Sequence, residues 1–281
     1  MTIAESLIKA AQELRSAGVA QPEREAASLL MFALGRDRTF LIAHSEYDLT
    51  ERESEIYDGS IGRRKTREPF QHIVGRQEFY GLDFEVSPDV LIPRPETELL
   101  VDAAIEILSK TENTKVCEIG TGSGCIVVSI LHTGPAASAV AVDISEQALA
   151  IARKNAENNG VAGRIEFSRS DIFEALDQRK FDLVVSNPPY IPAADIAVLQ
   201  SEVRDFDPII ALTDGGDGLS IIRRIIRDSP RFLNMNGTLL LEIGFGQATL
   251  VEEMFSRELW CEPEFLCDLQ GIARVVRSRV K

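Results

Sequence analysis

Cysteine, histidine and tryptophan are scarce in this chain of 281 residues, which has four, three and one of them. The cysteines lie in apolar or strand-like settings and form no Cys-x-x-Cys pair: Cys117, Cys125, Cys261 and Cys267. This spacing argues against a metal site and against a disulfide framework. We therefore expect no bound metal, and we expect the cysteines to be buried, reduced thiols that pack as small apolar side chains.

Long apolar runs are also absent. No run approaches the roughly 18 residues of a membrane-spanning helix. The first residues, Met1 to Glu5, have neither the basic start nor the apolar core of a signal peptide. We therefore expect a cytoplasmic protein that has no membrane partner.

Positively charged residues are few, since the chain has 44 acidic and 30 basic side chains and a net charge of −14. Lys and Arg must meet the phosphates of nucleic acid, so stable nucleic-acid binding is not expected. The one dense basic patch is Arg63-Arg64-Lys65-Thr66-Arg67. It is either a solvated helix end favoured by the helix dipole or a docking patch for an acidic protein or RNA.

One short motif that is present carries chemistry. Asn187-Pro188-Pro189-Tyr190 follows directly on the apolar run 181–186, which predicts a buried strand. A residue before proline is extended, and prolines have no N–H, so nearby carbonyls stay free to accept. The Asn187 side-chain oxygen and the Pro188 backbone oxygen can together accept both hydrogens of one NH2 group, while Tyr190 stacks on its flat face. Asn-Pro alone is also a common turn, but four residues in this order after a strand favour the binding interpretation.

A second motif indicates a nucleoside site. Residues 116–119 read as a short buried strand that runs into Gly120-Thr121-Gly122-Ser123-Gly124 and then into a helical run. Glycines allow a tight turn and close approach to a ligand, and a helix start presents unpaired N–H groups. A second strand ends at Asp143, about twenty residues further on, where a carboxylate typically accepts hydrogen bonds from ribose hydroxyls. Ser145 is read as a helix N-cap, which leaves Asp143 free to bind.

Asp171 has two interpretations. It follows the strand-like residues 164–168, and at the carboxyl edge of a sheet it can meet an adenine amino group. It can also cap the next turn, but its position at the sheet edge favours the cofactor contact.

The pattern along the chain predicts three parts. Residues 1–72 have helical periodicity, with Pro22 in the first turn of a helix, and we interpret them as a helical substrate-docking domain. Residues 73–95 have turn residues between alternating runs and predict a β-hairpin connector. In residues 96–281 helices alternate with strands, which predicts an α/β domain with a mostly parallel sheet. The predicted strands are 115–119, 139–143, 164–168, 181–186 and 238–243.

The chain ends with a predicted hairpin, in which 260–267 and 272–277 flank a turn at 268–271. One of these strands must run antiparallel to the sheet. A Rossmann-like sheet of seven strands with a terminal antiparallel hairpin is typical of S-adenosylmethionine-dependent methyltransferases.

Over nearly its whole length the chain resembles the release factor glutamine methyltransferases. The resemblance rests on four segments: Asn187-Pro188-Pro189-Tyr190, the run Glu118 to Gly124, the run Ile92-Pro93-Arg94-Pro95-Glu96-Thr97-Glu98, and Asp207-Pro208 followed by Ala211-Leu212 and Gly216-Asp217-Gly218-Leu219. The third is the most specific, because the first two recur in adenine and guanine methyltransferases. One departure is Asp207, where the family usually has glutamate.

The resemblance implies an activity and its site. The activity is methyl transfer from S-adenosylmethionine to the side-chain amide nitrogen N5 of the glutamine in the Gly-Gly-Gln motif of class I peptide chain release factors. The implied cofactor contacts are Gly120, Thr121, Gly122, Ser123, Gly124, Asp143, Ile172 and Asn187. The implied substrate contacts are Asn187, Pro188, Pro189 and Tyr190, of which Asn187, Pro188 and Tyr190 would be catalytic.

No histidine is assigned to catalysis, because His44, His72 and His132 do not adjoin either motif. An amide nitrogen needs positioning more than a base, since its proton becomes acidic only after methylation. Arg94, Glu96 and Glu98 either order a loop over the cofactor or begin a helix.

Alternatives with the same chemistry remain. A ribosomal-protein glutamine methyltransferase shares the motifs. A nucleic-acid adenine methyltransferase would also need a basic surface and a target-recognition region, and an adapter that only kept the nucleoside site would not need Asn187 and Tyr190. We expect a monomer.

Overall fold

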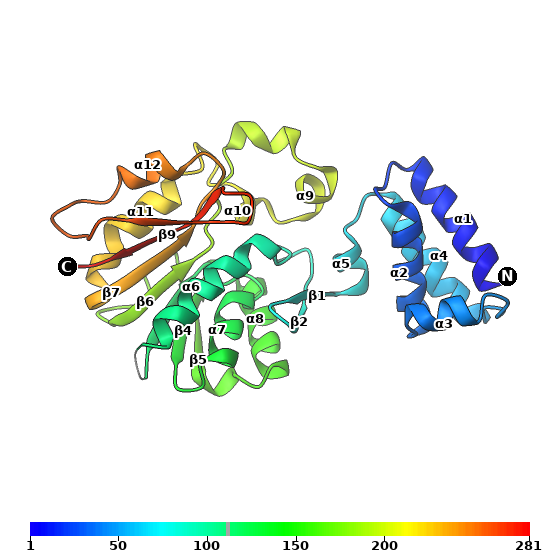
Figure 1. Ribbon diagram of the computed structural model, residues 1–281, viewed down its shortest axis with the longest axis horizontal. Helices are drawn as coiled ribbons and strands as arrows, with labels where there is room; N and C mark the ends of the chain where they lie inside the picture. The colour runs from blue at the N-terminus through cyan, green and yellow to red at the C-terminus, as the bar shows by residue number, and fades with distance from the viewer. Residues whose placement is uncertain (111–112) are drawn as a thin grey trace. The chain divides into compact units, whose positions relative to one another are not determined.

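The computed structural model describes residues 1–110 and 113–281. Within it the chain forms two compact units (Figure 1). The helical unit contains Met1–Arg76 and also Gln200–Phe206, and the sheet unit contains Gln77–Leu199 and Asp207–Lys281. The segment 200–206 therefore belongs to the helical unit although it is far from it in sequence.

Helices with regular caps build the helical unit. Threonines 2 and 50 each form a capping box with a glutamate three residues on, and Pro22 begins its helix as predicted. The apolar faces pack around Leu14, Leu29 and Leu30, which are fully buried. The helices are α1 (Ile3–Ser16), α2 (Pro22–Leu34), α3 (Arg38–Ala43), α4 (Glu51–Lys65), α5 (Phe70–Val74) and α9 (Ser201–Phe206).

The basic patch at the end of α4 is an ion-pair network inside the helical unit. The Arg64 side chain is only 5% exposed and pairs with Glu25 at 2.9 Å and with Glu202 at 3.1 Å. Arg67 pairs with Glu202 at 2.7 Å. The interpretation as a solvated helix end is therefore wrong for Arg64, while the docking interpretation stays untested.

The connector differs in part from the prediction. Ile73 and Val74 were expected in an extended run, but they belong to α5, which Pro69 precedes and Gly75 ends in the left-handed conformation. The hairpin itself lies at β1 (Arg76–Phe79) and β2 (Leu82–Glu85), which form a two-stranded sheet.

Among the described residues, the main sheet has seven strands in the order β5-β4-β3-β6-β7-β9-β8. Pairing is parallel from β5 to β7, whereas β9 runs antiparallel to both of its neighbours, so the predicted terminal hairpin is confirmed. The strand before the hairpin, β7, begins at residue 233, five residues before the predicted start at 238. The strands are β3 (Lys115–Ile119), β4 (Ser138–Asp143), β5 (Ile165–Arg169), β6 (Phe181–Ser186), β7 (Leu233–Glu242), β8 (Glu264–Cys267) and β9 (Ala273–Arg279).

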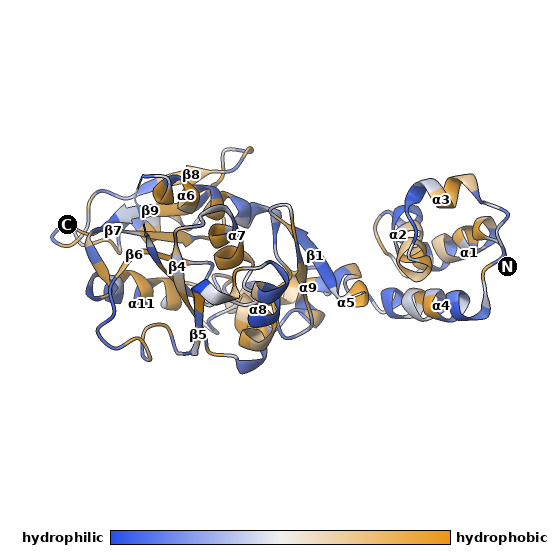
Figure 2. Cartoon of the chain, turned by 90° about the horizontal axis from the view of Figure 1, so that it is seen from below, coloured by the Kyte–Doolittle hydropathy of each residue, from blue (hydrophilic) through white to orange (hydrophobic). Residues whose placement is uncertain are grey.

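Helices cover both faces of this sheet. Alternate strand residues such as Val116 and Leu183 pack against α6 and α7, and their neighbours such as Cys117 and Val184 pack against α11 and α12. Figure 2 shows α7 largely orange, as expected for a helix whose residues are nearly all buried. The remaining elements are η1 (Pro95–Thr97), α6 (Glu98–Leu108), α7 (Cys125–Thr133), α8 (Glu146–Asn158), η2 (Ala162–Arg164), η3 (Ala193–Val198), α10 (Ile209–Leu212), α11 (Ser220–Asp228), η4 (Ser229–Arg231) and α12 (Ala248–Glu252).

The cysteine prediction holds only in part. Cys117 and Cys125 are buried free thiols, but Cys261 is half-buried and Cys267 is exposed. Cys267 ends the edge strand β8, in which the two terminal residues are exposed and the two central ones are half-buried. Within residues 1–110 and 113–281, none of the helices has the length and apolar character needed to cross a membrane.

Candidate active site

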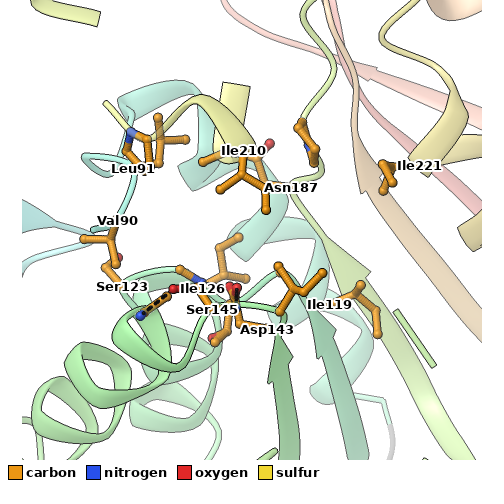
Figure 3. Close-up of a pocket in the computed structure, with 18 of the residues that line it drawn as sticks. Val90, Leu91, Ile119, Ser123, Ile126, Asp143, Ser145, Asn187, Ile210 and Ile221 are labelled. Atoms are coloured by element: carbon orange, nitrogen blue, oxygen red, sulfur yellow. Dashed lines mark hydrogen bonds between the residues drawn. The ribbon is translucent and has the colours of Figure 1, made fainter. Parts of the chain in front are cut away.

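A cavity of about 340 Å³ opens at the carboxyl ends of β3, β4 and β6 in the sheet unit. Ligands of open α/β sheets bind at this edge. Figure 3 shows Ile119 and Asp143 at the strand ends, with Val90 and Leu91 on a separate loop. Of the predicted site residues, those that line the cavity are Gly120, Thr121, Gly122, Ser123, Asp143, Asp171, Ile172, Asn187 and Pro189.

The glycine loop is held by its own hydrogen bonds. The N–H groups of Gly120 and Thr121 donate to the carbonyl of Val142, at 2.8 and 3.0 Å, and that of Gly124 donates to Thr121. Unpaired N–H groups were predicted at the start of the helix that follows. Of these three residues only Gly124, the N-cap residue of α7, belongs to that start, and its N–H is paired. The loop therefore offers a ligand close approach more than free donors.

Asp143 had been predicted to be free to bind a ligand. Its carboxylate instead accepts hydrogen bonds that hold the loop. One carboxylate oxygen accepts from the N–H of Gly122 and the other from that of Ser145, each at 2.9 Å. Burial raises the pKa of Asp143, while these N–H groups oppose the rise. A carboxylate has about four acceptor sites, so it can still accept from a ligand. Ser145 caps α8 as predicted.

Asp171 and Ile172 line the cavity beside the glycine loop and Asp143. The Asp171 carboxylate pairs with Arg224 of α11 at 2.9 Å, and both side chains line the cavity. Ile172 is buried and has a φ of 54°, which is strained for a β-branched residue. Such strain is common at binding sites, and no sequence pattern had indicated it.

The corner after β6 faces the cavity. Asn187 donates from its side-chain Nδ2 to Thr97 Oγ1 at 3.1 Å, and both residues line the cavity. Its side-chain oxygen is thereby directed away from Thr97. Figure 3 shows Asn187 near Ile210 and apart from Asp143 and Ser145.

Three predicted site residues do not line the cavity: Gly124, Pro188 and Tyr190. A Cβ at Gly124 would lie 3.1 Å from that of Ala152, so this glycine allows α7 and α8 to pack closely. Tyr190 lies behind the corner, where its hydroxyl donates to Glu242 at 3.1 Å. Burial and the Glu242 carboxylate raise the pKa of Tyr190.

Two buried carboxylates lie close to these motifs. Glu118, fully buried at the end of β3, accepts from the Thr121 hydroxyl at 2.5 Å, and burial raises its pKa to about 8. Glu242, 2% exposed at the end of β7, was not singled out from the sequence. The sequence signal that could have identified Glu242 is a charged residue at the end of an apolar strand, in the run Leu239 to Glu242.

The segment before α6 supplies further lining residues that were not assigned to the site. Pro95 begins a short 3-10 helix that leads into α6, so the interpretation as a helix start is confirmed. Arg94 also forms an ion pair with Asp207 at 2.5 Å, and the Asp207 side chain is fully buried. The segment thus both begins a helix and borders the cavity.

Family models match both units. Residues 5–75 match the PrmC N-terminal domain and residues 96–257 match the methyltransferase small domain. The chain is 43% identical to the release factor glutamine methyltransferase of Geobacter sulfurreducens, over 95% of this chain and 93% of that protein. It is 41% identical to the one from Koribacter versatilis, over 99% of each.

Solved structures share the fold at lower identity. A methyltransferase from Pyrococcus furiosus aligns with a TM-score of 0.53 and 18% identity, over 72% of this chain and 90% of that one. A T. thermophilus 16S rRNA methyltransferase in complex with AdoMet and guanosine aligns with a TM-score of 0.54 and 20% identity, over 73% and 50%. These matches concern the fold alone. With its full-length relatives, its two matched domains and its seven-stranded sheet, the chain belongs to the release factor glutamine methyltransferase family.

Proposed function

We propose that this protein transfers a methyl group from S-adenosylmethionine to the side-chain amide nitrogen N5 of the glutamine in the Gly-Gly-Gln motif of class I peptide chain release factors. The reaction would modulate translation termination, and it would take place in the cytoplasm. Family membership supports the proposal. The single observation that carries it is the Asn187 corner, whose side-chain oxygen is turned from Thr97 at the rim of the cavity.

The cavity suits S-adenosylmethionine. At about 340 Å³ it lies within the range of small-molecule sites, about 300 to 1,000 Å³. Asp143 keeps acceptor capacity for ribose hydroxyls, and Ile119, Ile126 and Ile172 offer apolar surface for a base. When bound there, the cofactor supplies an electrophilic methyl group on a sulfonium sulfur.

The chain's own groups position the nitrogen. An amide lone pair is delocalised, so the nitrogen is a poor nucleophile and its placement dominates. We propose that Asn187 Oδ1 and the Pro188 backbone carbonyl accept both N–H hydrogens. They would also stabilise the positive charge that develops on the nitrogen. As the new N–C bond forms, the bond from the methyl carbon to sulfur would break and leave S-adenosylhomocysteine as the product. The nitrogen would then release one of its two protons to solvent water, while Pro189 and Tyr190 stiffen the corner.

The helical domain is assigned to the substrate. We propose that residues 1–72 dock the release factor and that residues 73–95 link them to the methyltransferase domain, residues 96–281. The protein would act as a monomer on this protein partner, without a membrane or a stable complex with nucleic acid.

The test is methyl transfer in solution. The protein is incubated with labelled S-adenosylmethionine and, separately, with a class I release factor, a ribosomal protein and DNA. Label on the Gly-Gly-Gln glutamine alone is expected. Label on the ribosomal protein or on DNA alone, or on another residue of the release factor, would reject the proposal.

Replacing Asn187 tests the corner itself. Asn187→Ala removes the acceptor and is expected to lower kcat on the order of 10²-fold to 10³-fold, as the loss of one preorganised group does. The dissociation constant of S-adenosylmethionine, measured by calorimetry, should change little. Asn158→Ala, at the exposed end of α8, is the control. Full activity of the Asn187 variant would contradict the assignment.

A further inference from the structure

Glu242 is a buried carboxylate that contacts Tyr190, the last residue of the Asn187–Tyr190 corner, on the side away from the cavity. It ends β7, is 2% exposed, and accepts a hydrogen bond from the Tyr190 hydroxyl at 3.1 Å. The Thr97 side chain lies close to the same carboxylate and lowers its pKa, while the second carboxylate oxygen, Oε2, has no hydrogen-bond partner. Burying a carboxylate costs free energy, so stability alone does not explain a carboxylate here.

Thr97 joins Glu242 to Asn187. Its side chain is buried, and its hydroxyl oxygen accepts from Asn187 Nδ2 at 3.1 Å. An ionised carboxylate only accepts, so the Thr97 hydroxyl hydrogen points to Glu242. The Thr97 oxygen is then left as an acceptor, and Asn187 must present its N–H to it.

This polarity matters because both ends of a carboxamide have the same shape. With its NH2 group bound to Thr97, Asn187 directs its oxygen to the other side. If Thr97 donated to Asn187 instead, the amide would turn over and present its NH2 group to the substrate's NH2 group. Two donors would then face each other, and neither hydrogen bond would form.

We propose that Glu242 is a positioning residue that acts through Thr97 and Tyr190, and that it holds Asn187 with the side-chain oxygen toward the substrate amide. The inference deepens the proposed function and rests on it. Glu242 does not line the cavity, so its role is indirect.

The electrostatics around Glu242 agree with this role. Burial raises its pKa to about 7, while the side chains of Thr97 and Tyr190 oppose the rise. Of the charged groups nearby, Glu96 raises this pKa and Arg274 lowers it. A carboxylate kept in a place that disfavours its charge is typical of functional sites.

The first test separates positioning from structural support. Glu242→Leu removes the acceptor, so kcat on the release factor should fall on the order of 10²-fold. The thermal unfolding midpoint at pH 8 should change little, because removal of a buried charge offsets the loss of the acceptor for the buried Tyr190 hydroxyl. The affinity for S-adenosylmethionine should change little. Glu252→Gln, an exposed glutamate of α12, is the control for the loss of one charge.

Thr97 offers a matched pair. Thr97→Val keeps the shape and loses the hydroxyl, so its kcat should fall about as far as that of Glu242→Leu. Thr97→Ser restores the hydroxyl and should recover most of the lost activity. Wild-type kcat in the Leu or Val variant would overturn the proposal, as would losses of kcat that track losses in the unfolding midpoint.

A measurement without methyl transfer separates this inference from the proposed function. The side-chain NH2 signals of Asn187, assigned by selective ¹⁵N labelling, report its hydrogen bond to Thr97. They should shift in Thr97→Val and in Glu242→Leu and stay in place in Glu252→Gln. Unchanged signals in both site variants would overturn the relay even if the wild-type protein methylates glutamine. A wild-type protein that methylates no glutamine would instead reject the proposed function.

Discussion

Tyr190 forms hydrogen bonds through its backbone carbonyl as well as through its side-chain hydroxyl. Its carbonyl accepts from the Gln247 side chain at 2.9 Å. Gly218, whose φ is +76°, comes so close that a Cβ there would lie 2.2 Å from the same carbonyl oxygen. Only glycine fits both the backbone conformation and the space. The loop that carries Gly218 therefore sets the position of the corner.

Gly218→Ala should lower the free energy of unfolding by about 2 to 4 kcal/mol, which combines left-handed strain with overpacking. It should also lower kcat, because Tyr190 must move. Gly216→Ala is the matched control, since its Cβ would meet only Asp214 Oδ1 at 3.6 Å. Urea unfolding and methyl-transfer assays of both variants check this, and equal stability of the two would refute the steric argument.

Among the secondary-structure elements, the ion pair between Arg94 and Asp207 ties the segment before α6 to the segment before α10. The Asp207 side chain is fully buried and that of Arg94 is 35% exposed. Burial raises the pKa of Asp207 to about 6, and Arg94 opposes the rise. The folded state thus binds this proton more tightly than the unfolded chain, in which aspartate has a pKa of about 3.9. The tighter proton binding by Asp207 stabilises the folded state at low pH, and this stabilisation is lost as the pH rises from about 4 to about 6.

Arg94→Ala should raise the pKa of Asp207 further and extend this loss above pH 6. At pH 8 the variant should be less stable than the wild type by about 1 to 3 kcal/mol, since a buried charge has lost its partner. At pH 5, where Asp207 is largely protonated, the difference should be small. Urea unfolding at both values measures it. Arg94→Lys keeps the charge and is the control, and a pH-independent difference would count against this account.

Over the whole molecule, the helical unit takes in a segment from the middle of the methyltransferase sequence, residues 200–206. Its anchor is Glu202, which pairs with Arg64 and Arg67. Burial alone would raise the pKa of Glu202, but hydrogen bonds from Arg67 and Arg64 hold it at about 2. The folded pKa lies below the unfolded value of about 4.3, so this stabilisation is present above pH 4.3 and is lost as the pH falls toward 2.

Glu202→Gln should destabilise the helical unit at pH 7 by about 1 to 3 kcal/mol, because the buried Arg64 loses one of its partners. The difference from the wild type should shrink as the pH approaches 2. Asp205→Asn, whose partner Arg204 is exposed on the same helix, is the control and should cost less than about 0.5 kcal/mol. Thermal unfolding across this pH range decides the matter, and a constant difference down to pH 2 would disprove it.

The sequence alone determined the alternation of helices and strands, the glycine turn, the corner that follows β6 and the terminal hairpin. These features depend on local rules, such as side-chain period, the fixed φ of proline and the freedom of glycine, which act on neighbouring residues. Local rules did less well at Ile73, where one short turn of helix replaced an extended run.

Only the tertiary structure decided what lies behind the corner. Thr97 meets Asn187 from 90 residues away, and Glu242 meets Tyr190 from 52 residues away. The order of the strands brings these side chains together, and their burial then sets their pKa values and hydrogen-bond directions. The same holds for Arg64 and Cys267, because the neighbours that cover or expose a side chain are set by packing and not by its position in the sequence.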